Sequence, residues 1–115
     1  MNEYIEFNGE KYKKGCDLKN TTYKYVIVRT YSAGVFAGYI ESRNGKECTM
    51  LNARRLWYWS GAASLSQLAM EGVKNPEKCK FPCEVDKIEL TEVVEVIECT
   101  GKAKESIAGV KVWSV

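Results

Sequence analysis

The arginines of the chain and many of its aromatic residues gather between residues 29 and 59. Arginine presents a planar fork of N–H donors that suits two-point recognition of phosphate or carboxylate. An aromatic ring offers a face on which a purine can stack. Residues of these types at close spacing therefore indicate a site for a phosphorylated ring compound, and two stretches carry the pattern.

The first stretch runs from residue 29 to residue 38 (RTYSAGVFAG). Its small residues let backbone N–H groups approach an anion, its arginine adds positive charge, and its aromatic side chains can stack on a ring. The candidate ligand-binding residues here are Arg29, Tyr31, Ser32, Ala33, Gly34 and Phe36. The alternative is a plain hairpin turn, in which glycine supplies a positive φ.

The second stretch runs from residue 52 to residue 64 (NARRLWYWSGAAS), directly before a predicted helix. The N-terminus of a helix presents free N–H groups to phosphate, and an aromatic side chain beside it can stack on a base. The candidate ligand-binding residues here are Asn52, Arg54, Arg55, Trp57, Trp59, Gly61 and Ala62. The alternative is that Trp57 and Trp59 anchor the core from one strand face, with Tyr58 pointing outward.

The residue types that most catalytic sites use are missing. The chain has no histidine, and it shows no G-x-S-x-G, P-loop or dinucleotide-binding glycine pattern. Its five cysteines form an odd set, and Cys79 and Cys83 do not have the spacing of a redox or zinc motif. We therefore expect no enzyme activity, no catalytic residue, no cofactor and no metal site. The alternating glutamates could hold a cation, but a solvated strand face explains them better: Glu89, Glu92, Glu95 and Glu98.

The net charge of +2 is too small for a protein that binds long nucleic acid or a membrane surface. The charge is unevenly distributed, since residues 24–59 carry six basic side chains against two acidic ones, and residues 60–100 carry four against eight. One half of the molecule can therefore attract an anion. The sequence contains no apolar leader and no run of bilayer length, so we expect a cytoplasmic protein.

The pattern of apolar residues and turn residues predicts one α+β domain over residues 1–115, mainly antiparallel sheet with one short helix packed on it. Residues 4–13 surround Asn8-Gly9 and predict an N-terminal hairpin, so residues 1–22 are expected to be an appendage and 23–115 the core. Within the core we expect a central strand at 23–30, strands at 35–42 and 46–51, and a hairpin or meander at 85–90 and 93–99. A helix is expected from the capping pattern at Ser64 to Gly72, with a helical turn or two at 102–108 and a closing strand at 110–113.

From residue 23 to residue 115 the chain resembles a family of short phage and prophage proteins. The likeness rests on RTYSAGVFAG (29–38), ARRLWYWSGAASLSQLA (53–69) and KFPCEVDKIELTEV (80–93). This family is similar to the first type of Thoeris anti-defence protein, a sponge for cyclic ADP-ribose isomers. The resemblance implies a homo-oligomer in the host cytoplasm that captures a cyclic nucleotide immune signal without cleaving it, with cyclic oligonucleotides as a second ligand class. Residues 1–22 lie outside the likeness.

The leading hypothesis is therefore a sequestering protein in which Arg29, Arg54 and Arg55 neutralise phosphates and an aromatic side chain stacks on the purine. One rival is a protein–protein inhibitor or structural phage component that uses exposed aromatic residues as interface anchors. A second rival is a single-strand nucleic-acid binder, which the low net charge disfavours.

Overall fold

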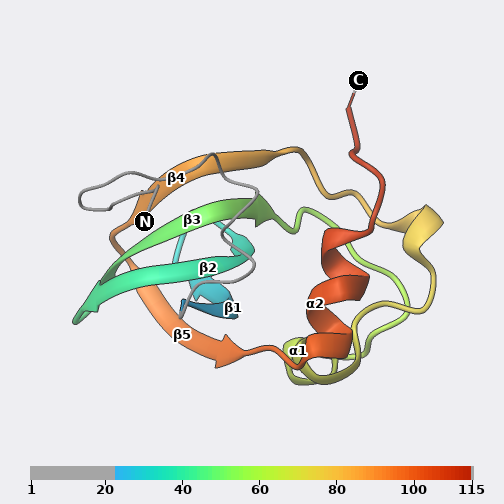
Figure 1. Cartoon of the computed structure of the whole chain (residues 1–115), viewed down its shortest axis with the longest axis horizontal. Helices are drawn as coiled ribbons and strands as arrows, with labels where there is room; N and C mark the ends of the chain where they lie inside the picture. Colours follow the sequence, from blue (N-terminus) through green and yellow to red (C-terminus); the bar gives the residue numbers. More distant parts are fainter. Residues whose placement is uncertain (1–22, 115) are drawn as a thin grey trace, which may run out of the picture.

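The computed structural model describes residues 23–114, so the predicted N-terminal hairpin and appendage lie outside the described residues. Between these limits the strands are β1 (Lys24–Thr30), β2 (Val35–Asn44), β3 (Glu47–Arg55), β4 (Glu84–Leu90) and β5 (Val93–Glu98). The helices are α1 (Leu65–Glu71), the 3-10 turn η2 (Pro76–Lys78) and α2 (Gly101–Ala108). Figure 1 shows their arrangement. The predicted α+β class, mainly antiparallel sheet, is confirmed.

The five strands form one sheet in the order β4-β3-β2-β1-β5, and each neighbouring pair is antiparallel. β1 lies inside the sheet, as its apolar and aromatic residues on both faces predicted. The pairing of β4 and β5 differs from the predicted hairpin or meander, because β4 pairs only with β3 and β5 pairs only with β1 among the described strands. Two strands adjacent in the sequence thus form opposite edges of the sheet.

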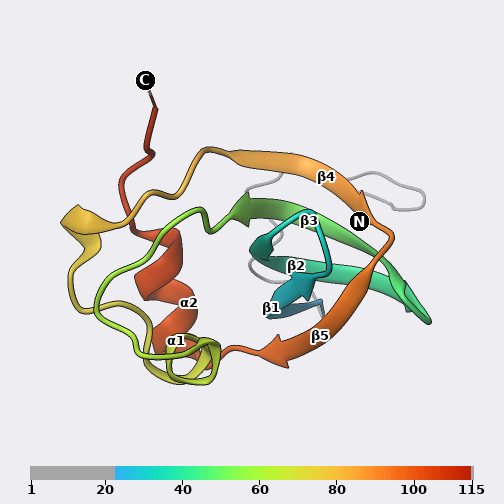
Figure 2. The same cartoon turned by 180° about the vertical axis from the view of Figure 1, so that it is seen from behind.

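This strand order requires the sheet to curl strongly. In a flat sheet four strand spacings of about 4.8 Å would separate β4 from β5 by about 19 Å. The three peptide units from Leu90 to Val93 reach about 11 Å at most. Figure 2 shows the result, with β4 and β5 converging on the short corner that joins them. The sheet is therefore a partly closed barrel.

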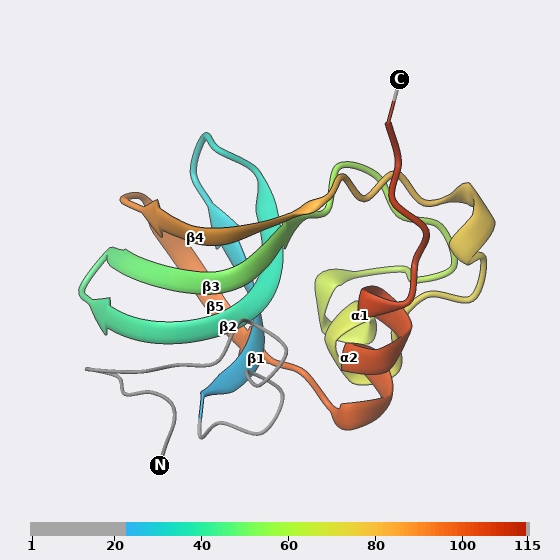
Figure 3. The same cartoon turned by 45° about the horizontal axis from the view of Figure 1, so that its top comes forward.

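The two faces of the curled sheet bury two separate apolar clusters. The described members of the inner cluster come from strands alone and from all five of them: Val26, Val28, Phe36, Cys48, Met50, Ala53, Leu90 and Val93. The other face carries Tyr25 and Ile27, which pack against Leu68 of α1 and Ile107 of α2 in the outer cluster. Figure 3 shows this division, with the sheet on one side and both helices on the other.

The helix predicted from the capping pattern is confirmed as α1. The Ser64 hydroxyl accepts a hydrogen bond from the Gln67 N–H, and the Gln67 side chain accepts one from the Ala63 N–H. Gly72 ends the helix with a φ of 78°, which glycine adopts without strain. The expected helical turns at 102–108 are also present, as the two-turn helix α2.

Two predicted strands differ from what the structure shows. The strand expected at 46–51 continues to Arg55, so part of the second candidate stretch is strand rather than loop. The closing strand expected at 110–113 does not form, because only Val112 makes an isolated bridge, to Phe81. In residues 23–114 no helix is both long enough and apolar enough to cross a bilayer.

Candidate functional site

The turn between β1 and β2 has a fixed shape and one prominent side chain. The Thr30 hydroxyl accepts a hydrogen bond from the Ala33 N–H at 3.0 Å and donates one to the Gly34 carbonyl at 2.8 Å. Gly34 has a φ of 107°, which a residue with a side chain rarely adopts. On this turn the Tyr31 side chain is 83% exposed. The first candidate stretch is therefore a hairpin turn, and it presents an aromatic ring to solvent.

A pocket of about 470 Å³ lies beside Tyr31, and its other lining residues are Lys46, Glu92, Val93 and Val94. These residues meet because the corner between β4 and β5 is hydrogen-bonded both to the β1–β2 turn and to the β2–β3 turn. The Tyr31 N–H donates to the Glu92 carbonyl at 2.9 Å, and the Val93 N–H donates to the Lys46 carbonyl at 2.9 Å. No carboxylate of the described residues lies within ion-pair distance of Lys46. The pocket thus offers an aromatic face, an unpaired cation and one carboxylate.

The side chain of Arg55, at the end of β3, lies beside Gly34 of the β1–β2 turn. Its Nε would be 4.0 Å from a Cβ added to Gly34, and its guanidinium lies 4.7 Å from the centroid of the Phe36 ring. Within residues 23–114 it has no ion pair, so its charge is available to an anion. Phe36 is 2% exposed, which argues against its predicted role in stacking on a purine. It supports the guanidinium of Arg55 instead.

Arg29 and Ser32 already have partners. The Arg29 Nε lies 2.6 Å from a carboxylate oxygen of Glu95, so its charge is largely balanced on the surface of the sheet. The Ser32 hydroxyl donates a hydrogen bond to the Glu92 carboxylate. The N–H of Ala33 is bound by Thr30, while those of Ser32 and Gly34 have no acceptor among the described residues. The turn therefore keeps two free backbone donors.

Arg54 lies in the core and does not line the Tyr31 pocket. The residue is 2% exposed, and its guanidinium donates to the carbonyls of Phe81, Pro82 and Ile107 at 2.8–3.0 Å. Burial lowers the pKa of this guanidinium, and the nearby Glu84 carboxylate opposes the shift. Arg54 is thus a structural residue that joins β3 to the segment before β4 and to α2. This placement argues against its predicted role in phosphate binding.

The rest of the second candidate stretch is divided between packing and surface. Trp59 and Ala62 are partly buried against the outer cluster. A Cβ on Gly61 would meet the Lys74 backbone nitrogen at 2.4 Å, so this glycine allows two segments to pack closely. Asn52 has a φ of 49° and lies at an irregularity in the pairing of β3 with β2. Trp57 is 65% exposed and lies on a different surface, described below.

The structure also gives no phosphate site at the start of α1. Gln67 accepts a hydrogen bond from the Ala63 N–H, and Ser64 accepts one from the Gln67 N–H. α1 has seven residues, so its N-terminus carries little of the dipole that attracts an anion to a longer helix. The expected contribution of free N–H groups at the start of this helix therefore has no support from the geometry.

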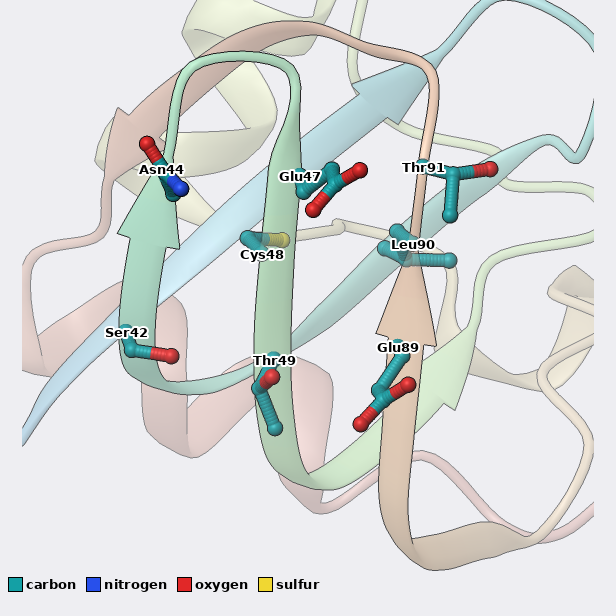
Figure 4. A pocket seen from close by; sticks show the side chains of 8 residues that line it. All are labelled: Ser42, Asn44, Glu47, Cys48, Thr49, Glu89, Leu90 and Thr91. Carbon is teal, nitrogen blue, oxygen red and sulfur yellow. The ribbon is translucent and has the colours of Figure 1, made fainter.

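A second pocket, of about 320 Å³, lies over β3 and the end of β4 (Figure 4). Its lining is rich in oxygen atoms and contains the carboxylates of Glu47 and Glu89 but no basic or aromatic side chain. Carboxylates repel a phosphate. Across residues 23–114, no three Cys, Asp or Glu side chains are grouped as metal ligands. This pocket does not suit the ligand class that the sequence predicts, and it includes none of the candidate ligand-binding residues.

Sequence reasoning found Tyr31 and Arg55 but missed Lys46 and Glu92. Lys46 follows the Asn44-Gly45 turn and Glu92 lies in the β4–β5 corner, so both are distant from Tyr31 in the sequence. Only the curl of the sheet brings them together. No local signal in the sequence marks them, because the Thr91-Glu92 link predicts a hairpin unless the strand order is known.

Comparison with known proteins gives a family and no function. The family model described as "Domain of unknown function (DUF6948)" matches residues 23–107. No curated protein and no solved structure matches the chain. The matched range includes β1 to β5, both helices up to Ile107, and every residue of the Tyr31 pocket.

Proposed function

Because the chain belongs to the DUF6948 family of domains of unknown function, we propose its function from the site alone: the protein binds a small phosphorylated nucleotide without cleaving it. The observation that carries this proposal is the β1–β2 turn, where the 83% exposed ring of Tyr31 shares a pocket with Lys46 and where Arg55 lies beside Gly34. Neither cation has a carboxylate partner among the described residues. An exposed tyrosine ring gains by stacking on a base.

Each group of the ligand has a matching group in the protein. The phosphates would contact Lys46 and Arg55, of which the arginine can make two parallel hydrogen bonds to one phosphate. The free N–H groups of Ser32 and Gly34 would add donors beside Arg55. The Glu92 carboxylate is an acceptor for a sugar hydroxyl or an exocyclic amine. This arrangement supports a ligand that has a ring, a sugar and phosphate within one small molecule.

The resemblance to a Thoeris anti-defence protein supplies the candidate ligand, a cyclic ADP-ribose isomer. In this proposal the phage protein sequesters that immune signal in the host cytoplasm and so keeps the downstream effector inactive. A sponge must hold its ligand at signalling concentration, which requires roughly 8–12 kcal/mol of binding free energy. The homo-oligomer expected from the same resemblance would place several such sites in one particle.

Two thiols, Cys99 and Cys48, are poor candidates for a nucleophile. Burial raises the pKa of the Cys99 thiol to about 12, and burial also raises the pKa of Cys48. Both thiols therefore stay protonated at neutral pH, and a protonated thiol is a poor nucleophile. Neither cysteine lines the Tyr31 pocket.

The test mixes the purified protein with a panel of cyclic ADP-ribose isomers and cyclic di- and trinucleotides, and measures binding by calorimetry and the released nucleotide by mass spectrometry. We expect one nucleotide to bind and to return intact after heating. Tyr31→Ala and Lys46→Gln should each weaken its binding about tenfold, which corresponds to the loss of one stacking or phosphate contact. The matched controls are Tyr58→Ala and Lys111→Gln, which change an exposed residue outside the site.

Three results would contradict the proposal. A nucleotide that returns cleaved makes the protein an enzyme. Equal losses of affinity in the site variants and the controls place the ligand elsewhere. If no member of the panel binds at micromolar protein, the ligand class is wrong.

A further inference from the structure

A second exposed aromatic surface lies away from the Tyr31 pocket, where the chain leaves β3. We name it the aromatic ribbon and define it by Trp57, Tyr58, Lys80, Val112 and Trp113, all of which are exposed. Three short segments form it, joined by an antiparallel bridge between Tyr58 and Lys80 and by a parallel bridge between Phe81 and Val112. In Figure 3 the chain after β3 and the chain before β4 run together toward the helices. The ribbon thus extends the sheet beyond the barrel.

A local bulge explains why two adjacent aromatic residues are both exposed. In a regular strand, neighbouring side chains point to opposite faces, so one of the two would face the core. Here the N–H groups of Trp57 and Tyr58 both donate to the Lys80 carbonyl, at 3.1 and 3.3 Å. Two residues therefore oppose one, as in a β-bulge. Trp57 is 65% exposed and Tyr58 is 51% exposed.

Lys80 lies among these rings. As the bridge partner of Tyr58 it shares a face with that residue, and its Nζ lies 5.7 Å from the centroid of the Trp113 ring. The next residue, Phe81, points the other way and is fully buried. The ribbon is held in place from beneath by this ring, and its outer face combines aromatic rings with an ammonium group.

The one charged residue of the ribbon, Lys80, is basic. Lys78 and Lys111 flank it in the sequence, and neither these lysines nor Lys80 has an ion pair within residues 23–114. Lysine is depleted from protein–protein interfaces, although tryptophan and tyrosine are enriched in them. Lysines beside exposed aromatic rings are instead typical of surfaces that bind single strands, where bases stack on the rings and phosphates meet the charges.

From this combination we infer that the aromatic ribbon binds single-stranded nucleic acid without sequence preference. The net charge of the chain predicted no long nucleic acid as a partner, but a sum over the whole chain does not describe the lysine of the ribbon and the two next to it in the sequence. The stacking face excludes a duplex as the preferred ligand, because paired bases are not free to stack on protein rings. The inference does not rest on the function proposed for the Tyr31 pocket.

The test titrates the full chain with a fluorescein-labelled oligothymidylate and follows both fluorescence anisotropy and quenching of tryptophan emission, over a series of salt concentrations. We expect quenching on binding, because Trp57 and Trp113 are exposed on the ribbon. Trp57→Ala should weaken binding about tenfold, as the loss of one stacked base predicts. Lys80→Gln should reduce the slope of log affinity against log salt by about 0.7, the value for one single-strand phosphate contact.

Matched controls separate this surface from the rest of the molecule. Met70→Ala removes an exposed apolar side chain of α1, and Lys102→Gln removes an exposed lysine of α2; both should leave oligothymidylate binding unchanged. Duplex DNA of the same length should bind more weakly than the single strand. Equal binding of the duplex would overturn the inference, and so would equal binding of polyglutamate, a polyanion without bases. An affinity that Trp57→Ala does not change would also overturn it. Absence of binding at low salt would overturn it too, and would direct the search to a protein partner of the ribbon.

Discussion

Two adjacent arginines of β3 show how differently the same residue type can be used. Arg54 is buried and donates to three backbone carbonyls from separate segments. Arg55 is exposed, lies over the Phe36 ring and has no ion pair among the described residues. The first therefore contributes to stability, whereas the second is available to a ligand.

Replacing Arg54 should destabilise the protein strongly. Arg54→Met removes the donors of three hydrogen bonds in the core, although the Phe81 and Ile107 carbonyls keep the N–H groups of Trp113 and Val110 as donors. We expect the free energy of unfolding to fall by about 3 kcal/mol or more. The matched variant Arg55→Met should cost less than about 1 kcal/mol, because its side chain is exposed. Urea denaturation of both variants measures the difference, and equal losses would show that the carbonyl contacts of Arg54 contribute little.

At the scale of the element, β3 depends on an irregularity at Asn52. Its pairing with β2 shifts register between Ala37 and Tyr39, and Asn52 adopts a positive φ of 49° there. On the facing strand, a Cβ on Gly38 would lie 2.7 Å from the Ala53 Cα, so only glycine permits this close approach. The irregularity changes which side chains of β3 face the helices.

The conformation of Asn52 predicts an unusual order of stabilities. Asn52→Gly should leave the free energy of unfolding within about 0.5 kcal/mol of the original, because glycine adopts a positive φ freely. Asn52→Ala should cost about 1–2 kcal/mol, since the left-handed conformation is strained for alanine. Thermal and urea denaturation measure both variants. A variant with alanine that is as stable as the one with glycine would contradict this account.

The sequence predicted those elements of the fold that local signals determine. β1, β2 and α1 follow from alternation, from glycine-containing turns and from the cap at Ser64. The burial of Arg54 could not be predicted in this way. Strict alternation gives residues 50 and 54 the same face, yet Met50 belongs to the inner cluster and Arg54 contacts α2. The irregularity at Asn52 exchanges the faces, and nothing in the local pattern marks it.

The candidate site was predicted in part for the same reason. Tyr31 and Arg55 have the expected residue types in the expected stretches. The pairing of Tyr31 with Lys46 depends on the curl of the whole sheet, which arises from contacts between distant strands. A short link between two strongly alternating strands reads as a hairpin, and only the full strand order shows that β4 and β5 are opposite edges.

At the scale of the whole molecule, the raised pKa values of a thiol and a phenol make the free energy of unfolding depend on pH. Burial raises the pKa of Cys99 to about 12 and also raises the pKa of Tyr25. In the unfolded chain a thiol loses its proton near pH ~8.5 and a tyrosine near pH ~10. Above these values the unfolded state binds fewer protons than the folded state. The free energy of unfolding must therefore fall as the pH rises.

We expect this decline to begin above pH ~8.5 and the contribution of Cys99 to reach about 1–2 kcal/mol at pH ~10. Cys99→Val removes the titrating thiol, so the decline in the variant should be smaller by that amount. Urea denaturation at neutral pH and at pH ~10 measures it. An identical decline in the variant and the original protein would assign the effect to other groups, such as Tyr25.

The pairing of β1 with β5 also has a consequence for synthesis of the chain. Lys24 of β1 and Glu98 of β5 form an ion pair across 74 positions of sequence. A ribosome releases β1 long before β5, so one side of β1 has no partner until almost the whole domain has been translated. Loop closure over such a separation is slow compared with formation of the β1–β2 hairpin. During translation the nascent chain therefore exposes an apolar strand edge, and this is the stage at which a chaperone would have most to protect.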